Sequence, residues 1–199
     1  MQPLKIAMVS PEFFPLAKTG GLGDITSALS KALGQLGHQV KVFLPCYQTV
    51  QNRGQIKDSG LKPLSLQIGD KNVSASLKST AVNGNSAEIF LVDAPVYYDR
   101  PELLRDPDTG LPYPDNDERF ILFCRATLEF IKQSGFQPDV IQANDWRAAL
   151  VCAYLKSLYA EDRLFSQTSC LLSLNSSSPT SDPFETTNGF FPLRGELPK

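Results

Sequence analysis

Residues 18–24, with the sequence KTGGLGD, constrain the fold most strongly because three glycines occur where a strand is expected to pass into a helix. The preceding residues 4–9 form a short apolar run typical of a buried parallel strand. From Leu22 onward, through Ile25, Leu29, Leu33 and Leu36, apolar residues recur every three or four positions. This spacing predicts a helix with one buried face, so the glycines lie at a strand-to-helix corner.

Such a corner can bind an anion. The first turn of a helix leaves backbone N–H groups without intrahelical partners and carries partial positive charge. Gly20, Gly21 and Gly23 have no Cβ and would let a phosphate approach the backbone, while Lys18 adds a full positive charge. Asp24 could cap the helix or bind a sugar hydroxyl. Alternatively, the glycines only allow the helix to pack tightly on the sheet. Their spacing matches neither GxGxxG nor GxxxxGK[ST], so a dinucleotide-binding fold or an NTPase is not expected.

The next segments extend the corner into a βαβ unit. Gly34 and Gly37 end the helical pattern, and residues 39–44 form a second β-rich run. A right-handed crossover makes the two strands parallel and places the glycines at the carboxyl edge of the sheet, where α/β proteins bind ligands. His38, the only histidine, falls at the opposite edge, so we expect a turn or surface role for it. One α/β domain is the expected class.

The middle of the chain has a different pattern. Three β-rich runs, at 64–68, 73–78 and 88–92, are separated by Gly-Asp and Asn-Gly turn signals and predict a small antiparallel excursion. The proline-rich residues 93–114 predict a long loop of the kind that is usually functional or mobile.

A second strand-to-helix corner follows a helix predicted over residues 117–134. Val140 and Ile141 form the centre of a short buried strand, which leads into a helix predicted over 147–159. Asp145 lies between them, at the carboxyl end of the strand. Its carboxylate could orient ligand hydroxyl groups or only cap the helix. The adjacent Trp146 is expected in the core rather than as a ligand platform.

Composition excludes several classes of protein. Lys and Arg number 19 against 21 Asp and Glu, a net charge of −2, and no basic cluster occurs, so nucleic acid and anionic membranes are not expected partners. No apolar run has transmembrane length and no signal-peptide pattern begins the chain, which predicts a cytoplasmic protein.

Four cysteines, Cys46, Cys124, Cys152 and Cys170, occur in apolar contexts without C-x-x-C spacing. With a single histidine in the chain, no metal site is expected. We predict a buried, reduced thiol at each of the four positions.

Five motifs together resemble one family. They are SPEFFPLAKTGGLGD at 10–24, VFLPCY at 42–47, YYDRP at 97–101, YPDNDERF at 113–120 and PDVIQANDWRAALV at 138–151. Their order is that of the N-terminal domain of bacterial glycogen synthases and plant starch synthases. The resemblance implies an α/β fold with a Rossmann-like, doubly wound, mainly parallel sheet, one half of a two-domain glycosyltransferase of GT-B type. It also implies transfer of glucose from ADP-glucose to the non-reducing end of an α-1,4-glucan, with no cofactor and no metal.

The resemblance also assigns residues. It implies that Lys18, Gly20 and Gly21 bind the nucleotide sugar and that Asp24 is an acidic site residue. It implies that Asp145 lines the cleft near the donor glucose, which makes it the candidate catalytic residue. ADP-glucose and the glucan are the implied partners, and UDP-glucose remains open as an alternative donor.

The chain departs from the family pattern at several positions. Gln142 and Asn144 replace the family's histidines, Arg147 stands where a histidine is frequent, and Leu174 occupies the place of a catalytic-site histidine. The family's second nucleotide-binding domain has no counterpart in the sequence. We therefore expect the isolated chain to be inactive unless a separate C-terminal synthase domain or synthase subunit completes it. The alternative is a non-catalytic domain that binds glucan or a synthase.

The character of the sequence changes near residue 168. Ser and Thr supply 11 of the last 34 residues, with four prolines, although residues 170–174 could form one more strand. We predict a synthase-type domain over 1–168 and a divergent, poorly ordered tail over 169–199. The abrupt shift suggests a frame change, an altered splice or a truncation as the origin of that tail.

Overall fold

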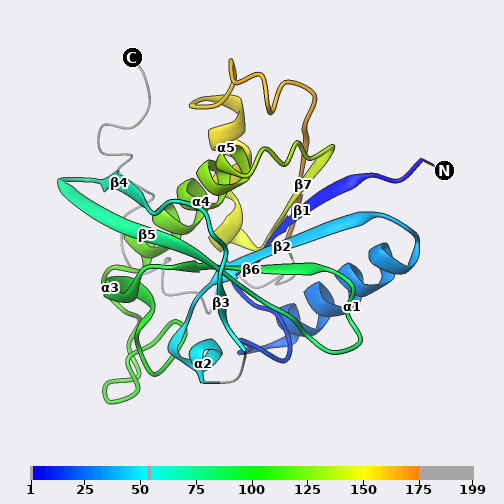
Figure 1. The fold of residues 1–199 in the computed structure, drawn as a ribbon. Coiled ribbons are helices and arrows are strands. Elements are labelled where there is room, and N and C mark those ends of the chain that lie inside the picture. Colours follow the sequence, from blue (N-terminus) through cyan, green and yellow to red (C-terminus); the bar gives the residue numbers. More distant parts are fainter. Residues whose placement is uncertain (1, 53–54, 175–199) are drawn as a thin grey trace.

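The computed structural model describes residues 2–52 and 55–174, which fold around one eight-stranded sheet (Figure 1). The strand order is β3-β5-β6-β2-β1-β7-β8, and β4 pairs with β5 outside this path. The strands are β1 Lys5–Val9, β2 Gln39–Pro45, β3 Lys57–Asp58, β4 Leu64–Ile68, β5 Lys71–Thr80, β6 Glu88–Asp93, β7 Val140–Asn144 and β8 Ser169–Ser173. The helices are α1 Gly21–Gln35, α2 Gln48–Gln51, α3 Pro95–Tyr98, α4 Asn116–Gln133, the 3-10 turn η1 Trp146–Ala148, and α5 Leu150–Lys156.

The centre of the sheet is parallel, as the sequence predicts. β1 pairs in parallel with both β2 and β7, so that Ala7 lies opposite Lys41 on one side and Ile141 on the other. β6 extends the parallel part beyond β2, and β8 extends it beyond β7. Helix α1 lies on one side of the sheet, and α4 and α5 lie on the other (Figure 1). The apolar run of β1 is buried because helices cover both of its faces.

The predicted antiparallel excursion is confirmed. β4 and β5 form an antiparallel hairpin, and β5 also pairs antiparallel with β6. β6 is also parallel to β2, so the run at 88–92 pairs with the excursion on one side and with the parallel part of the sheet on the other. Its apolar residues Ile89, Leu91 and Val92 are buried as in a central strand.

Helix α1 buries only part of the predicted face, on which Leu29 and Leu33 pack against the core. Leu22 is buried, but Ile25 and Leu36 are 47% and 74% exposed. The buried face also contains Thr26 and Ser30, whose hydroxyls donate to the carbonyls of Leu22 and Ser27 at 2.9 Å. Hydroxyls satisfied inside the helix can face the sheet, and apolar periodicity alone does not detect them.

The opposite edge of the sheet holds His38, as predicted. Its Nδ1 accepts a hydrogen bond of 3.0 Å from the Leu4 N–H, next to the start of β1. This contact joins the turn before β2 to the first strand and keeps the histidine away from the carboxyl edge.

The cysteines fall into two pairs. Cys46 and Cys124 are buried free thiols, which confirms two of the four predictions. Cys152 on α5 and Cys170 on β8 form a disulfide, so the prediction of reduced thiols was wrong for these two. The reason is tertiary: α5 packs against β8 and brings the two Cα atoms to 5.7 Å, although the residues are 18 positions apart.

Removing this disulfide should destabilise the fold. Closing a loop of this length stabilises a domain by about 3 kcal/mol, so Cys170→Ser should lower the free energy of unfolding by about that amount. Urea unfolding followed by circular dichroism measures the loss. Cys124→Ser keeps the disulfide, so its stability should still fall when a reducing agent is added, whereas that of Cys170→Ser should not change. Equal stability of the wild type with and without reductant would contradict the expectation.

Beyond residue 168 the chain forms β8, which confirms the strand predicted at 170–174 with a shift of one residue. Residues 175–199 lie outside the described part, so the predicted disorder of the tail is not tested. Within the described residues, no helix combines the length and apolar character needed to cross a membrane.

Candidate functional site

The candidate site lies at the carboxyl edge of the three central strands. Glu12 follows β1, Tyr47 follows β2 and Asp145 follows β7. The chain leaves β1 toward β2 on one side, and β7 is the neighbour of β1 on the other side. This is the switch point of the sheet, where open α/β sheets form a crevice for ligands.

The three glycines of the corner differ in their surroundings. A Cβ on Gly23 would lie 3.2 Å from the Ala17 carbonyl oxygen and 3.4 Å from the Phe14 nitrogen, so this glycine permits tight packing. A Cβ on Gly20 or Gly21 would meet nothing within 4 Å. None of the three has a positive φ, so unusual backbone angles do not explain them. Open space therefore remains only at Gly20 and Gly21.

This open space faces the start of α1. The helix begins after Gly20 without a side-chain cap, so Asp24 does not cap it. Instead, Asp24 Oδ2 accepts a bond from Lys18 Nζ at 2.5 Å, and both side chains are largely exposed. An exposed ion pair contributes little to stability, so Lys18 can exchange this partner for a ligand anion at small cost.

Glu12 holds the corner in place, and the sequence analysis missed it. Its side chain is 1% exposed. The carboxylate accepts from the Thr19 N–H at 2.8 Å and the Thr19 hydroxyl at 2.7 Å, with a longer contact of 3.4 Å to the Gly20 N–H. The available signal was an acidic residue in the otherwise apolar segment 11–17, which is rarely buried without a partner.

Arg147 connects this corner to the second one. Its Nη2 group lies 3.0 Å from Glu12 Oε1 and 3.2 Å from Asp145 Oδ2, and all three side chains are buried. Burial by itself raises the pKa of the Glu12 carboxyl, but the Arg147 charge and the donors of Thr19 outweigh it and lower that pKa below its ordinary value.

Acid should weaken the fold through Glu12. Because its pKa is lower in the folded state, its contribution is complete above the ordinary value of 4.5 and is lost as the pH falls through the folded pKa. Urea midpoints measured between about pH 6 and about pH 3 should fall less steeply for Glu12→Gln than for the wild type. Replacement of the exposed Glu102 by Gln is the control. Parallel curves for the wild type and Glu12→Gln would contradict the assignment.

Asp145 has an unusual backbone. Its φ of 73° and ψ of 163° form a conformation that residues other than glycine rarely adopt. Its N–H donates to the Ser173 carbonyl at 2.7 Å, and the carboxylate makes no capping bond to η1, so the capping alternative was wrong. The Oδ1 atom is buried without a partner among the described residues. A strained, buried carboxylate with a free oxygen is typical of a functional position.

The neighbours of Asp145 are structural. Gln142 Nε2 donates to Asn144 Oδ1 at 3.3 Å and to Ser173 Oγ at 3.2 Å, and Asn144 Nδ2 donates to the Val9 carbonyl at 3.3 Å. These amides tie β7 to β8 and β1. Trp146 packs against the core and meets the Phe120 ring edge-on at 5.8 Å between centroids, as predicted.

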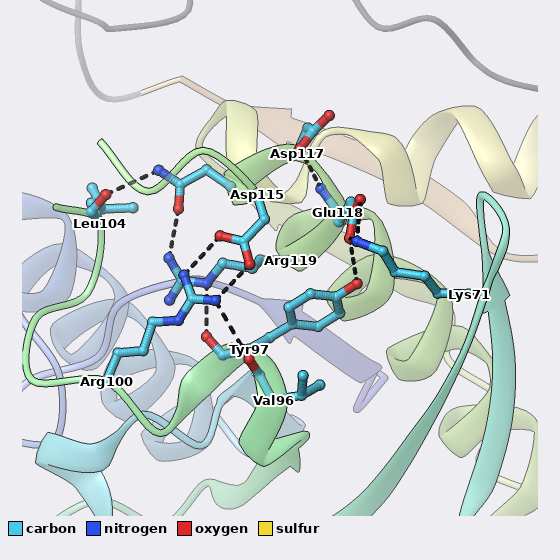
Figure 2. A network of polar contacts seen from close by, with 10 residues as sticks. Lys71, Val96, Tyr97, Arg100, Leu104, Asp115, Asp117, Glu118 and Arg119 are labelled. Carbon is cyan, nitrogen blue, oxygen red and sulfur yellow. Dashed lines mark hydrogen bonds and ion pairs between the residues drawn. The ribbon is translucent and has the colours of Figure 1, made fainter. Parts of the chain in front are cut away.

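A second polar network anchors the segment expected to be a loop at 93–114 (Figure 2). Arg100 binds both carboxylate oxygens of Asp115, at 2.7 Å and 2.5 Å. Glu118 accepts from Tyr97 Oη and from Lys71 Nζ at 2.7 Å, which joins α3 and α4 to the β4–β5 hairpin. The segment contains α3 and is held at several points.

Arg119 lies at the centre of this network (Figure 2). It is fully buried, and its Nε donates to the Tyr97 carbonyl at 2.9 Å. Its Nη1 donates to Asn116 Oδ1 at 2.5 Å, and the guanidinium lies 5.1 Å from the Tyr113 ring centroid. It has no carboxylate in ion-pair contact among the described residues.

Comparison with known proteins gives the class to which this fold and site belong. The family model for the starch synthase catalytic domain matches residues 5–176, and the chain therefore belongs to that family. Glycogen synthase of Photobacterium profundum is 37% identical over 175 residues, which cover 87% of this chain. Glycogen synthase of Elusimicrobium minutum is 39% identical and covers 86% of it.

The solved structures agree. The catalytic domain of starch synthase IV from Arabidopsis thaliana, bound to ADP and acarbose, superposes with a TM-score of 0.74 at 28% identity and covers 86% of this chain. The match covers 34% of that structure, and it covers 33% and 35% of the two glycogen synthases. The chain thus spans about a third of the length of the relatives it matches. The resemblance seen in the sequence is confirmed, as is the doubly wound fold of a GT-B half.

Proposed function

We propose that this chain forms the N-terminal side of the nucleotide-sugar cleft of an α-1,4-glucan synthase that uses ADP-glucose. The observation that carries the proposal is that the two strand-to-helix corners, at residues 18–24 and at Asp145, lie together at the switch point of the sheet. The open helix start at Gly20 and Gly21 and the strained carboxylate of Asp145 are joined by the buried Glu12–Arg147 pair. The match to a starch synthase domain bound to ADP supports the choice of nucleotide.

Each proposed residue has a distinct task. The uncapped N–H groups after Gly20 would receive a phosphate of the donor, and the open space at Gly20 and Gly21 would admit it. Lys18 would turn from Asp24 toward the phosphate, and Asp24 would then be available to a hydroxyl group. The free Oδ1 of Asp145 would accept a hydroxyl of the glucosyl group near the reacting centre.

Glucose transfer should need more than these residues. Retaining transfer depends on groups that position the donor from both walls of the cleft, and the relatives are about three times as long as this chain. We propose the synthase-type domain over 1–168 as one wall; the sheet continues beyond that boundary to Ser173 and the family match to residue 176. The chain alone should incorporate no labelled glucose from ADP-glucose into glycogen, and incorporation abolished by Asp145→Ala would overturn this view.

The second candidate is a non-catalytic domain that binds glucan or a synthase. It is favoured by one observation: Leu174, in the place of a catalytic-site histidine, is 65% exposed and cannot act as a general base or hydrogen-bond donor. If a polypeptide carrying the rest of a synthase restores glucose transfer when added, the enzymatic proposal holds. Glycogen binding without any restored transfer would favour the second candidate.

The direct test of the proposed site is ADP binding. In an NMR titration with ADP at millimolar concentration, the amides of Gly20, Gly21 and Gly23 should shift. Lys18→Ala should weaken ADP binding by about five- to tenfold, because one charge-assisted contact to phosphate is lost. Lys132→Ala, which removes a lysine paired with Asp162 on another element, is the matched control. Unmoved glycine amides would leave tight packing as the only role of the corner.

A further inference from the structure

Arg147 differs from an ordinary buried ion-pair residue. It is 6% exposed and contacts both Glu12 and Asp145 through a single nitrogen, Nη2. Its Nε and Nη1 atoms are buried without a partner among the described residues. Leaving buried donors unpaired costs free energy, so packing and pairing alone do not account for this side chain.

The contacts form a continuous path between two distant parts of the chain. Arg147 binds Glu12 across 135 positions of sequence, and Glu12 in turn accepts from Thr19 and approaches Gly20 at the start of α1. The same guanidinium holds the Asp145 carboxylate. One side chain thus fixes the glycine corner and the Asp145 corner relative to each other.

The local charges show why a cation is needed here. Glu12, Asp24 and Asp145 bring three negative charges to the two corners, whereas Lys18 and Arg147 bring two positive ones. A phosphate at the start of α1 would lie next to the carboxylate that binds Thr19. Without Arg147, that carboxylate would be an unpaired buried anion and would repel the phosphate.

We propose that Arg147 is a positioning residue of the nucleotide-sugar site. It neutralises Glu12, holds Thr19 and Gly20 through Glu12 in the geometry that receives a phosphate, and fixes the Asp145 carboxylate. The inference rests on the proposed function, because the phosphate belongs to the nucleotide sugar. It concerns a residue at which this chain departs from the family pattern, since a histidine is frequent there.

The first experiment needs no ligand. Arg147→His and Arg147→Lys are compared with the wild type by amide NMR, and Arg163→His, a change at an exposed arginine, is the control. Arg147 makes no direct bond to Thr19, so movement of the Thr19 and Gly20 amides in Arg147→His reports the path through Glu12. Arg147→Lys keeps the charge and should move them less. Unchanged Thr19 and Gly20 amides in a folded Arg147→His protein would overturn the proposal.

The second experiment measures ADP affinity by calorimetry. Arg147→His and Glu12→Gln should each weaken binding by about tenfold, and Arg147→Lys should stay within about threefold of the wild type. The double variant Glu12→Gln/Arg147→His should bind about as weakly as either single variant, because both changes break the same path. The proposal would be overturned if the loss of affinity in the double variant equalled the product of the two single losses. It would also be overturned if the single variants bound ADP as tightly as the wild type.

The two experiments separate failure of the inference from failure of the proposed function. If the wild type does not bind ADP, the proposed function fails, while the ligand-free amide shifts still decide whether Arg147 organises the glycine corner. If the wild type binds ADP and the variants bind it equally well, only the inference fails. If Arg147→His does not fold, Glu12→Gln and Arg147→Lys still decide the question. Arg147→Lys must keep an ADP affinity close to that of the wild type, and Glu12→Gln must lower it.

Discussion

Arg147→Met should lower the free energy of unfolding by about 3–5 kcal/mol, because it removes the cation that the described structure places between two buried carboxylates. Methionine fills much of the same volume, so the loss comes mainly from electrostatics. Glu12 is 1% exposed and Asp145 is 7% exposed, and neither can regain enough hydration inside the fold to compensate. Both would remain as uncompensated charges or would have to take up protons.

Equilibrium unfolding in guanidinium chloride at neutral pH measures this loss. Arg163→Met, at an exposed arginine, should change stability by less than about 0.5 kcal/mol and is the matched control. The triple variant Glu12→Gln/Asp145→Asn/Arg147→Met should recover part of the loss, because neutral amides cost less to bury than unpaired carboxylates. A loss below about 1 kcal/mol for Arg147→Met alone would show that the pair is dispensable.

The glycine corner and the parallel core were predictable because their signals are local. A run such as residues 4–9 has the length and apolar content of a strand buried on both faces, and glycines directly before an apolar periodic segment favour a helix start. The corner at Asp145 was predictable for the same reason. The sequence did not show that Gly23 packs tightly whereas Gly20 and Gly21 leave open space. This difference depends on where the fold places the backbone of residues 14–17.

The contacts that join the two corners could not be predicted. Glu12 and Arg147 are separated by 135 positions, and their pairing follows from the placement of β1 beside β7. The Cys152–Cys170 disulfide has the same origin, since it requires α5 and β8 to pack together. Contacts between side chains that are far apart in the sequence produce no periodic pattern along the chain, so they could not be predicted from it.

The prediction of which α1 side chains are buried was partly wrong for a related reason. The buried face includes Thr26 and Ser30 because their hydroxyls bond within the helix, whereas the apolar Ile25 is about half exposed. Hydrophobic periodicity counts side chains by type and cannot register a hydroxyl that satisfies itself. The part of α1 nearest the glycine corner was placed correctly because Leu22 is both apolar and buried.

The network of Figure 2 connects to the candidate site through packed aromatic rings. Tyr98 Oη donates to the Arg119 carbonyl at 2.8 Å, and the Tyr98 ring meets that of Tyr47 edge-on at 5.7 Å between centroids. Tyr47 in turn follows β2 at the carboxyl edge, and burial raises its pKa to about 12, so it stays a neutral hydroxyl at physiological pH. The polar network therefore continues through packed rings to the switch point.

Arg119→Ala should be the most damaging change in this network, with an expected loss of about 4 kcal/mol. The side chain is fully buried, so truncation leaves a large cavity, and the Tyr97 carbonyl and Asn116 Oδ1 lose their donors. Burial lowers the pKa of the Arg119 guanidinium, but the group remains charged, so relief of its desolvation offsets part of the loss.

A matched pair of variants separates packing from hydrogen bonding at this position. Arg119→Met keeps most of the volume but loses the donors, so it should cost about half as much as Arg119→Ala. Arg105→Ala, at an exposed arginine that donates to the Gly110 carbonyl, should cost less than about 0.5 kcal/mol. Amide exchange should accelerate between residues 97 and 115 in Arg119→Ala while the β1 amides stay protected, because α3 and the following segment lose their buried anchor. Uniform acceleration across the sheet would show instead that the network stabilises the whole domain and does not act locally on the flank of the site.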